Sequence, residues 1–320
     1  MHGQESDQFY ADFEAKFRGS RELIAERLQA YTPILEVLRC STPSLSALDL
    51  GCGRGEWLEL LAKHAITGRG IDCNAVMIQT CQTHQLQVQQ QEAHAALLDQ
   101  QASSLNIITA FHLAEHLAFP LLRTLISEAH RVLKPGGILI LETPNPENLS
   151  VGAMNFYMDP THQRPIPPPL LQFAVQHAGF QDAHILRLQH CQELVNATSP
   201  GLTDVLQGVS PDYAVLGIKT GPPHLHQRLA AEAKNLNGLS LQQVSDRFDS
   251  SNQANLKSLQ AAVATLQSEI NELISKQRPT ARALKREHKT TTLQQKSLIK
   301  ALKTKLRQSK RILNSWTAKR

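Results

Sequence analysis

The sequence has no apolar run long enough to cross a membrane, and its first residues lack the apolar core of a secretory signal. Its five cysteines are odd in number and do not have the spacing of a metal motif or a disulfide framework. Aromatic residues make up only 5% of the 320 residues, but 41% of the chain is hydrophobic, which suffices for one large domain and an appendage. We therefore expect a soluble, cytoplasmic protein in a reducing compartment.

Acidic residues are nearly missing from the C-terminal part of the chain. Residues 276–320 carry 15 Lys and Arg but a single acid, Glu287, for a net charge of +14. The other 275 residues carry 18 bases and 27 acids, for a net charge of −9. This asymmetry indicates a molecule in two parts, with an acidic body and a basic extension.

Strand-like and helix-like segments alternate from residue 46 to about 220. Strands are predicted near 46–50, 67–71, 86–90, 105–111, 137–143, 183–189 and 213–219, and helices near 56–65, 75–84, 119–133 and 167–178. This alternation predicts a seven-stranded, doubly wound α/β sheet of the Rossmann-like type, with ligands beyond the carboxyl ends of its strands. The last two strands have no obvious helix between them, which favours a terminal antiparallel pair.

The segments on either side of this region are predicted to be helical. Residues 1–45 form an N-terminal helical cap, in which Phe9, Tyr10, Phe13 and Phe17 recur at helical spacing, either to pack on the domain or to cover its ligand. Residues 46–222 form the ligand-binding domain. Residues 223–277 form a helical linker and short coiled coil, and 278–320 a basic amphipathic tail beyond an interruption at Pro279.

Apolar residues step by three and four before this proline, which is coiled-coil spacing. They are Leu256, Leu259, Val263, Leu266, Ile270 and Leu273. We expect the C-terminal helices to form a homo-oligomer. The basic tail is suited to the anionic inner face of the cell membrane, to an acidic polymer or to another helix, and nucleic acid is the less favoured of these partners because the tail has few aromatics.

The segment from Leu48 to Glu56 reads as a strand, a glycine-rich turn and a helix start. Its D-x-G-x-G-x-G pattern favours S-adenosylmethionine over a dinucleotide, with Asp49, Gly51 and Gly53 close to the ligand because glycine lets the backbone approach it. Asp72 ends the second strand, where a carboxylate can accept both ribose hydroxyls. Capping of the helix from Ala75 is the alternative role for Asp72.

Two further strands end in candidate ligand-binding residues. Glu92 and Ala93 follow the third strand and are predicted to contact the adenine; the alternative for Glu92 is an ordinary surface carboxylate. The fourth strand ends in Phe111 and His112, which we place at the cofactor, and is followed by Glu115 and His116 at the position of the reactive methyl group. His116 is a candidate general base. Glu115 and His116 could also bind a divalent metal, but we assign no metal site.

The loop Phe156-Tyr157-Met158-Asp159-Pro160-Thr161-His162 precedes a proline-rich stretch. Loops at this edge of a doubly wound sheet determine substrate specificity. We therefore expect Tyr157 and Asp159 in the acceptor pocket, with His162 as the alternative base. Packing of the loop explains these residues equally well.

Residues 48–146 together resemble class I S-adenosylmethionine-dependent methyltransferases. The resemblance rests on Leu48–Glu56, Gly70-Ile71-Asp72, Glu115-His116-Leu117 and Leu133-Lys134-Pro135-Gly136-Gly137. A narrower resemblance covers about residues 9–190, through Phe17–Ile24, Glu142–Asn148 and Phe156–His162. It is to bacterial O-antigen chain-terminating methyltransferases of surface-polysaccharide clusters, some of which have coiled-coil tails.

This resemblance implies an S-adenosylmethionine-dependent O-methyltransferase acting on a sugar or phosphate oxygen of a glycan or lipid-linked glycan, with Arg18 near the cofactor's carboxylate. The sequence departs from the group at Glu92, where Asp is common, and has no kinase motif after residue 222. A nucleic-acid methyltransferase that uses the basic tail and a non-catalytic scaffold that acts through its coiled coil are the alternatives.

Overall fold

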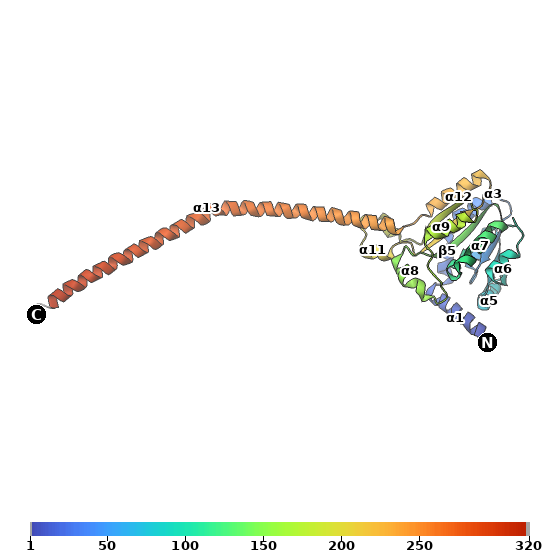
Figure 1. Ribbon diagram of the computed structural model, residues 1–320, viewed down its shortest axis with the longest axis horizontal. Helices are drawn as coiled ribbons and strands as arrows, with labels where there is room; N and C mark the ends of the chain where they lie inside the picture. Colours follow the sequence, from blue (N-terminus) through green and yellow to red (C-terminus); the bar gives the residue numbers. More distant parts are fainter. Residues whose placement is uncertain (1, 318–320) are drawn as a thin grey trace. The chain divides into compact units, whose positions relative to one another are not determined.

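The computed structural model describes residues 2–317, although the side chains of 2–4, 6 and 312–317 lie outside the description. The chain divides into two units, one ending at Ser251 and one starting at Asn252. The first unit contains a seven-stranded sheet with helices on both faces (Figure 1). The doubly wound α/β fold predicted from the sequence is thereby confirmed.

The strand order of the sheet is β3-β2-β1-β4-β5-β7-β6. The strands are β1 (Ser46–Leu50), β2 (Thr67–Asp72), β3 (Val88–Gln90), β4 (Leu105–Phe111), β5 (Leu133–Pro144), β6 (Asp182–Leu188) and β7 (Asp212–Ile218). Strands β1 to β5 pair in parallel, whereas β7 is antiparallel to both β5 and β6. Every residue of β4 and β7 is buried, as expected for central strands covered on both faces.

Helices cover the two faces of the sheet. One core cluster joins the sheet to α2 (Arg21–Leu28), η1 (Gln29–Tyr31), α3 (Thr32–Ser41), α4 (Glu56–Lys63), α5 (Ala75–Thr83) and α12 (Pro223–Asn235). The other joins it to α6 (Ala93–Leu98), α7 (Phe119–Val132) and α9 (Pro168–His177). The remaining short elements are η2 (Ala114–His116), α8 (Leu149–Ala153), η3 (Asn155–Met158), α10 (Gln192–Asn196) and α11 (Leu202–Gln207).

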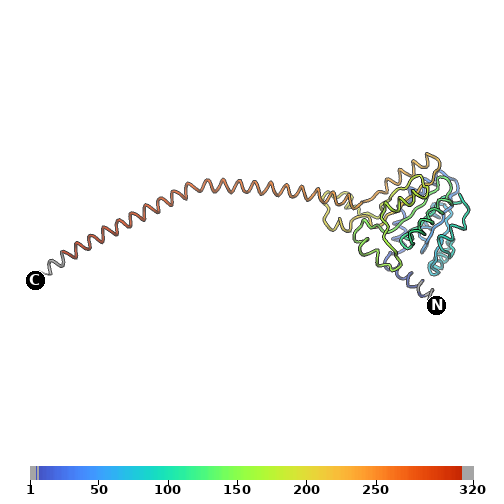
Figure 2. Tube along the Cα trace, viewed as in Figure 1, coloured from blue at the N-terminus to red at the C-terminus, as the bar shows by residue number. Residues whose placement is uncertain are grey.

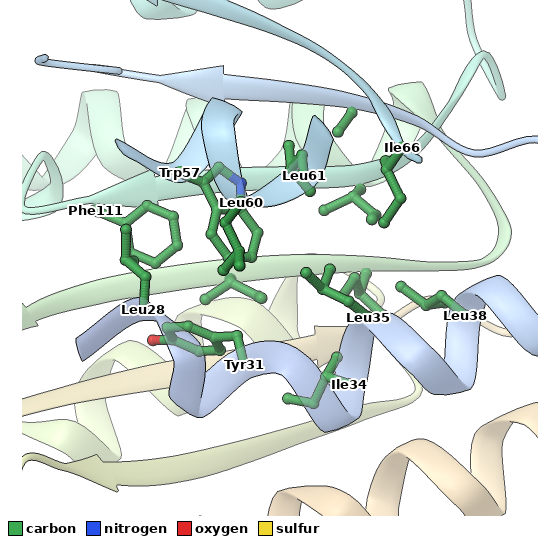
Figure 3. Close-up of a cluster of buried hydrophobic side chains, with 14 of the residues drawn as sticks. Leu28, Tyr31, Ile34, Leu35, Leu38, Trp57, Leu60, Leu61, Ile66 and Phe111 are labelled. Carbon is green, nitrogen blue, oxygen red and sulfur yellow. The ribbon is translucent and has the colours of Figure 1, made fainter. Parts of the chain in front are cut away.

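An aromatic cluster fixes the N-terminal helices to the sheet. Tyr31 from η1 packs on Trp57 of α4 and Phe111 of β4, with ring centroids 5.8 and 5.5 Å away, and Trp57 and Phe111 lie 5.0 Å apart (Figure 3). All three side chains are buried. Trp57 is the second residue of α4, so the cluster ties the start of this helix to the sheet.

Helix α12 differs from the linker that the sequence predicts from residue 223. Its Leu225, Leu229 and Ala233 are buried in the same core as the α3 side chains. The amphipathic pattern of this stretch is satisfied within the first unit because its apolar side covers β6 and β7.

Helix α13 (Leu241–Thr317) runs through Pro279, so the predicted interruption there is wrong (Figure 2). Proline lacks the N–H that would have bonded the carbonyl of Ser275, and its ring crowds that carbonyl, but helix-forming residues continue on both sides. The six apolar residues of the predicted coiled coil are 52–64% exposed, and self-association through them stays a prediction. Within residues 2–317, no helix combines the length and apolarity of a membrane span.

The glycine-rich turn between β1 and α4 has a left-handed backbone at three positions, Gly51, Gly53 and Gly55, with φ of 70°, 50° and 85°. The N–H groups of Gly51 and Cys52 both donate to the carbonyl of Ile71, which ties the turn to β2. At Gly55 an added Cβ would lie 2.3 Å from Leu86 Cδ1 and 3.0 Å from Cys81 Sγ. Both the backbone and the neighbouring side chains therefore require glycine there.

We predict that Gly55→Ala lowers the free energy of unfolding by about 1–3 kcal/mol, because alanine must adopt a left-handed backbone and displace Leu86. Gly201→Ala is the matched control. Its φ is −86° and its nearest neighbour would be Asp204 Oδ2 at 3.7 Å, so its effect should stay within about 0.5 kcal/mol. Urea denaturation of both variants measures the difference, and equal effects would contradict the steric argument.

Candidate active site

A cavity of about 490 Å³ lies at the carboxyl ends of β1, β4 and β5. The glycine-rich turn forms one part of its wall, and His116 and His162 form another. Helix α1 (His2–Phe17) contributes Tyr10, Phe13 and Glu14. The cavity thus joins the predicted cofactor loop to the predicted catalytic histidines in one space.

Asp49, the last but one residue of β1, is buried in the wall of this cavity. Thr109 Oγ1 donates to its Oδ1 over 2.7 Å. Burial raises the pKa of the Asp49 carboxyl to about 7, against the opposing effects of this hydrogen bond and the charge of Arg18. A cationic ligand group in the cavity would restore the charged form of Asp49.

Asp72 lies outside the cavity lining and bridges two backbone segments. Its Oδ2 accepts from Gly53 N at 2.9 Å and its Oδ1 from Asn74 N at 2.8 Å. Helix α5 is capped instead by Asn74, whose Oδ1 accepts from Val76 N and Met77 N. Asp72 therefore orders the glycine-rich turn, and its place at the end of β2 is the one from which ribose binding is predicted.

The wall beside the turn fits a ligand that has both a carboxylate and an ammonium group. A Cβ built on Gly53 would meet only Glu14 Oε2, at 3.9 Å, so the backbone faces open space there. Glu14 Oε2 is buried without a hydrogen-bond partner, whereas its Oε1 accepts from Arg18 at 2.9 Å. The residues present thus offer an uncommitted acceptor and a guanidinium at the same wall, which suits the amino-acid end of S-adenosylmethionine.

Glu92 and Ala93 lie away from the cavity. Glu92 is exposed and caps α6, with its two oxygens accepting from His94 N at 3.0 Å and Ala95 N at 2.8 Å. Ala93 is buried as the first residue of α6. The structure therefore gives Glu92 a capping role, and the adenine contact predicted for these two residues stays a prediction.

His112 lies directly after β4 and has a left-handed backbone, with φ of 54°. Its Nδ1 is 3.3 Å from Glu115 Oε1, and its Nε2 is 3.4 Å from Glu142 Oε1 and 3.9 Å from Asp212 Oδ1. Burial lowers the pKa of His112, but bonding to Glu115 and Glu142 and the charge of Asp212 outweigh it and raise the pKa to about 10. His112 is therefore an imidazolium at neutral pH.

The two predicted bases are brought together across 46 residues of sequence. The rings of His116 and His162 have centroids 4.6 Å apart. His162 Nδ1 lies 2.6 Å from the carbonyl of Phe156, and His116 Nδ1 lies 2.9 Å from Thr161 Oγ1. Burial lowers the pKa of His116. Burial raises the pKa of Glu115, but the neighbouring His112 outweighs this and lowers the pKa of that carboxyl to about 2.

The two predicted acceptor residues have different surroundings. Asp159 is buried in the cavity wall and accepts from Thr161 N and Thr161 Oγ1, at 2.8 and 2.6 Å. Tyr157 is 62% exposed and lies outside the lining. Phe111, predicted at the cofactor, lines the cavity beside Trp57.

Several lining residues were missed by the sequence analysis, among them Arg27, Leu188, Gln189, Pro211 and Asp212. They come from α2 and from the ends of the antiparallel pair β6 and β7. No motif marks them in the sequence, because only the order of strands brings them to β5. The apolar spacing of residues 9–17 was the one signal for the α1 wall.

Comparison with known proteins agrees with this arrangement. Residues 20–185 match the methyltransferase domain family. The crystal structure of a SAM-dependent methyltransferase from Archaeoglobus fulgidus is 32% identical, with a TM-score of 0.58, and the match covers 66% of this chain and 100% of that chain.

Curated relatives match over shorter stretches. A ubiquinone biosynthesis O-methyltransferase of Coxiella burnetii is 34% identical over 102 residues, 31% of this chain and 43% of that protein. A probable S-adenosylmethionine-dependent methyltransferase of Mycolicibacterium smegmatis is 28% identical over 143 residues, 45% of this chain and 54% of that protein. The chain thus spans about half the length of these two curated relatives, or less.

The family match covers more than half of the chain, and the related archaeal structure is covered along its whole length. Together with the doubly wound sheet and the glycine-rich turn at its cavity, these findings show that the chain belongs to the class I S-adenosylmethionine-dependent methyltransferases.

Proposed function

We propose that this enzyme is an O-methyltransferase whose acceptor is a hydroxyl or phosphate oxygen of a glycan or lipid-linked glycan. One observation carries the proposal: His116 and His162 lie side by side in the wall of the cavity that also contains the glycine-rich turn. Transfer to a hydroxyl benefits from removal of its proton, and imidazole is the side chain suited to this at neutral pH. The O-methyltransferase names of curated relatives support the reaction type.

S-adenosylmethionine supplies an electrophilic methyl group on a sulfonium. Transfer would replace the S–C bond by a C–O bond to the acceptor oxygen and leave a neutral thioether, and the hydroxyl proton would be removed at the histidine pair. The chain's contribution is to orient the two reactants and to accept charge. Asp49, Glu14 and Arg18 would hold the amino-acid end of the cofactor, and the imidazolium of His112 would remain fixed among its carboxyl partners.

The proposal of a glycan acceptor rests on the residues around the histidines. It also rests on the resemblance of residues 9–190 to bacterial O-antigen chain-terminating methyltransferases. Asn155, Asp159 and Gln189 offer amide and carboxyl groups in the cavity wall, and Phe156 offers an aromatic surface. Such a mixture suits the alternating polar and apolar faces of a sugar. Methyl transfer from labelled cofactor to cell-envelope glycans and lipid-linked intermediates, with RNA as comparison, tests it; transfer to RNA alone would overturn it.

We predict that cofactor affinity rises with pH through the Asp49 titration. The neutral carboxyl must lose its proton to pair with the ammonium group, so affinity should rise roughly five- to tenfold from pH 6 to 7.5, given a pKa of about 7. Calorimetry with S-adenosylmethionine measures this. Asp49→Asn should bind more weakly with a flatter profile, whereas the exposed Asp249→Asn should match wild type. An unchanged profile in Asp49→Asn would remove Asp49 from the cofactor site.

We predict that His116→Ala and His162→Ala each retain cofactor affinity while turnover falls by about 100-fold or more, the usual contribution of a group that removes a proton. His224, an exposed residue of α12, provides the matched control, and His224→Ala should turn over normally. Steady-state methyl transfer together with cofactor calorimetry separates the two effects. Normal turnover in both cavity variants would refute the assignment.

We further propose that the basic segment attaches the enzyme to an anionic membrane surface. Its Lys and Arg side chains are exposed from Lys276 to Arg311, and each can contribute about 1 kcal/mol near an anionic leaflet. A chain that ends at Gln277 should lose binding to vesicles containing anionic lipid, and the full chain should not bind neutral vesicles. Equal binding by both chains, or full-chain retention on RNA but not on vesicles, would contradict this role.

A further inference from the structure

We infer that Glu115, His116 and His162 form a binding site for a divalent transition-metal cation of the zinc class, which would deprotonate the acceptor. The inference rests on the proposed O-methyltransferase function and specifies how its histidine pair acts. Each of the three side chains offers one ligand atom, and these atoms lie within 4.8 Å of one another. Two imidazole nitrogens and one carboxylate oxygen are a donor set that zinc and neighbouring metals prefer.

The hydrogen bonds behind the two rings leave one nitrogen of each free. The carbonyl of Phe156 can only accept, so His162 Nδ1 must carry the proton at this 2.6 Å contact. Thr161 Oγ1 donates its only proton to Asp159 Oδ1, so it must accept a hydrogen bond from His116 Nδ1. In the neutral form of each ring the Nε2 lone pair is therefore the available one. Fixing of Nδ1–H by a backbone or side-chain oxygen is the usual arrangement behind a metal-bound histidine.

One oxygen of the Glu115 carboxylate can also serve as a ligand atom. Thr143 Oγ1 donates to Glu115 Oε2 at 2.8 Å, whereas Glu115 Oε1 has only the ion pair with His112, whose Nδ1 lies 3.3 Å away. Glu115 is fully buried, and a bound cation would give its Oε1 a second positive partner. Its Oε1 is 3.9 Å from His162 Nε2. Bonds of about 2.1 Å in a tetrahedral site require about 3.4 Å between ligand atoms, so the pair must close by about 0.5 Å.

A second group of potential ligands, His112, Glu142 and Asp212, lacks a histidine nitrogen with a free lone pair. Both nitrogens of His112 face carboxyl oxygens, so both carry protons and neither offers a lone pair. The imidazolium of His112 also lies beside the proposed site, where it would repel a cation. Three further carboxyl groups, Glu142, Asp159 and Asp212, lie around the two histidines and His112 and favour the cation.

Two of the three ligands line the cavity, whereas Glu115 lies behind them. A cation held there keeps coordination positions open toward the cavity. The acceptor hydroxyl would take one of these positions, where the cation lowers its pKa and the proton leaves to water. His116 and His162 would then act as ligands and not as direct proton acceptors.

The test uses tag-free full chain freed of metal by chelation. Binding of Co²⁺ is followed by its visible absorption, and binding of Zn²⁺ is measured by calorimetry. We expect one equivalent to bind to wild type and to His224→Ala. His162→Ala and Glu115→Gln, which lose a ligand atom, should bind at least about 100-fold more weakly. Thr161→Val should bind about 10–100-fold more weakly, because it loses only the oxygen behind His116. Far-UV circular dichroism and cofactor affinity confirm that each variant is folded.

The site would be refuted if wild type showed no saturable binding of Co²⁺ or Zn²⁺ up to about 1 mM. It would also be refuted if His162→Ala and Glu115→Gln bound the metal as tightly as wild type. Methyl transfer distinguishes this failure from failure of the proposed function. Undiminished transfer by chelated enzyme that binds no metal would refute the cation and leave the O-methyltransferase standing. Metal binding with transfer only to nitrogen or RNA acceptors would refute the glycan O-methyltransferase while the site remains.

Discussion

Pairing of buried charge at the carboxyl edge of the sheet is the constraint on which the site depends. Glu115 and Glu142 are buried there, and burying carboxylates without partners would cost several kcal/mol each. His112 supplies the cation between them, at the expense of a left-handed backbone directly after β4. Tyr31, which belongs to the N-terminal helical segment, donates to Glu142. The same buried carboxylate therefore also connects that segment to the sheet.

The cavity is lined by residues inside and outside the family match. The glycine-rich turn, Asp49 and the histidine pair lie within the residues matched by the methyltransferase domain family. Helix α1 precedes that match, and Leu188, Gln189 and Asp212 follow it, yet all of them line the cavity. Segments outside the match therefore line the same space as the glycine-rich turn.

The histidine pair gives the proposed reaction and the proposed cation site a common physical basis. Both require nitrogens that lack hydrogen-bond partners at the cavity, and in both the Nδ1 contacts hold the rings in place. A direct base must alternate between protonated and neutral forms, next to an imidazolium at His112. A cation carries out the same deprotonation without that change, which is the physical reason to favour it.

The sequence by itself determined the sheet, the glycine-rich turn and the identity of the cofactor. These follow from local patterns, since apolar runs form buried strands and the glycines of D-x-G-x-G-x-G permit the left-handed backbone seen at Gly51, Gly53 and Gly55. Sequence patterns also indicated His116 and His162, but not that their rings meet or which nitrogen of each is free. At Pro279 the local pattern was misleading, because a proline that usually interrupts a helix did not end α13.

Only the tertiary structure decided the partners of each side chain. It brought Asp212 and Gln189 to the cavity. It also surrounded His112 with carboxyl groups from three separate segments. Contacts of this kind depend on strand order and on burial, which raise or lower a pKa through neighbours far away in the sequence, and no local pattern encodes them.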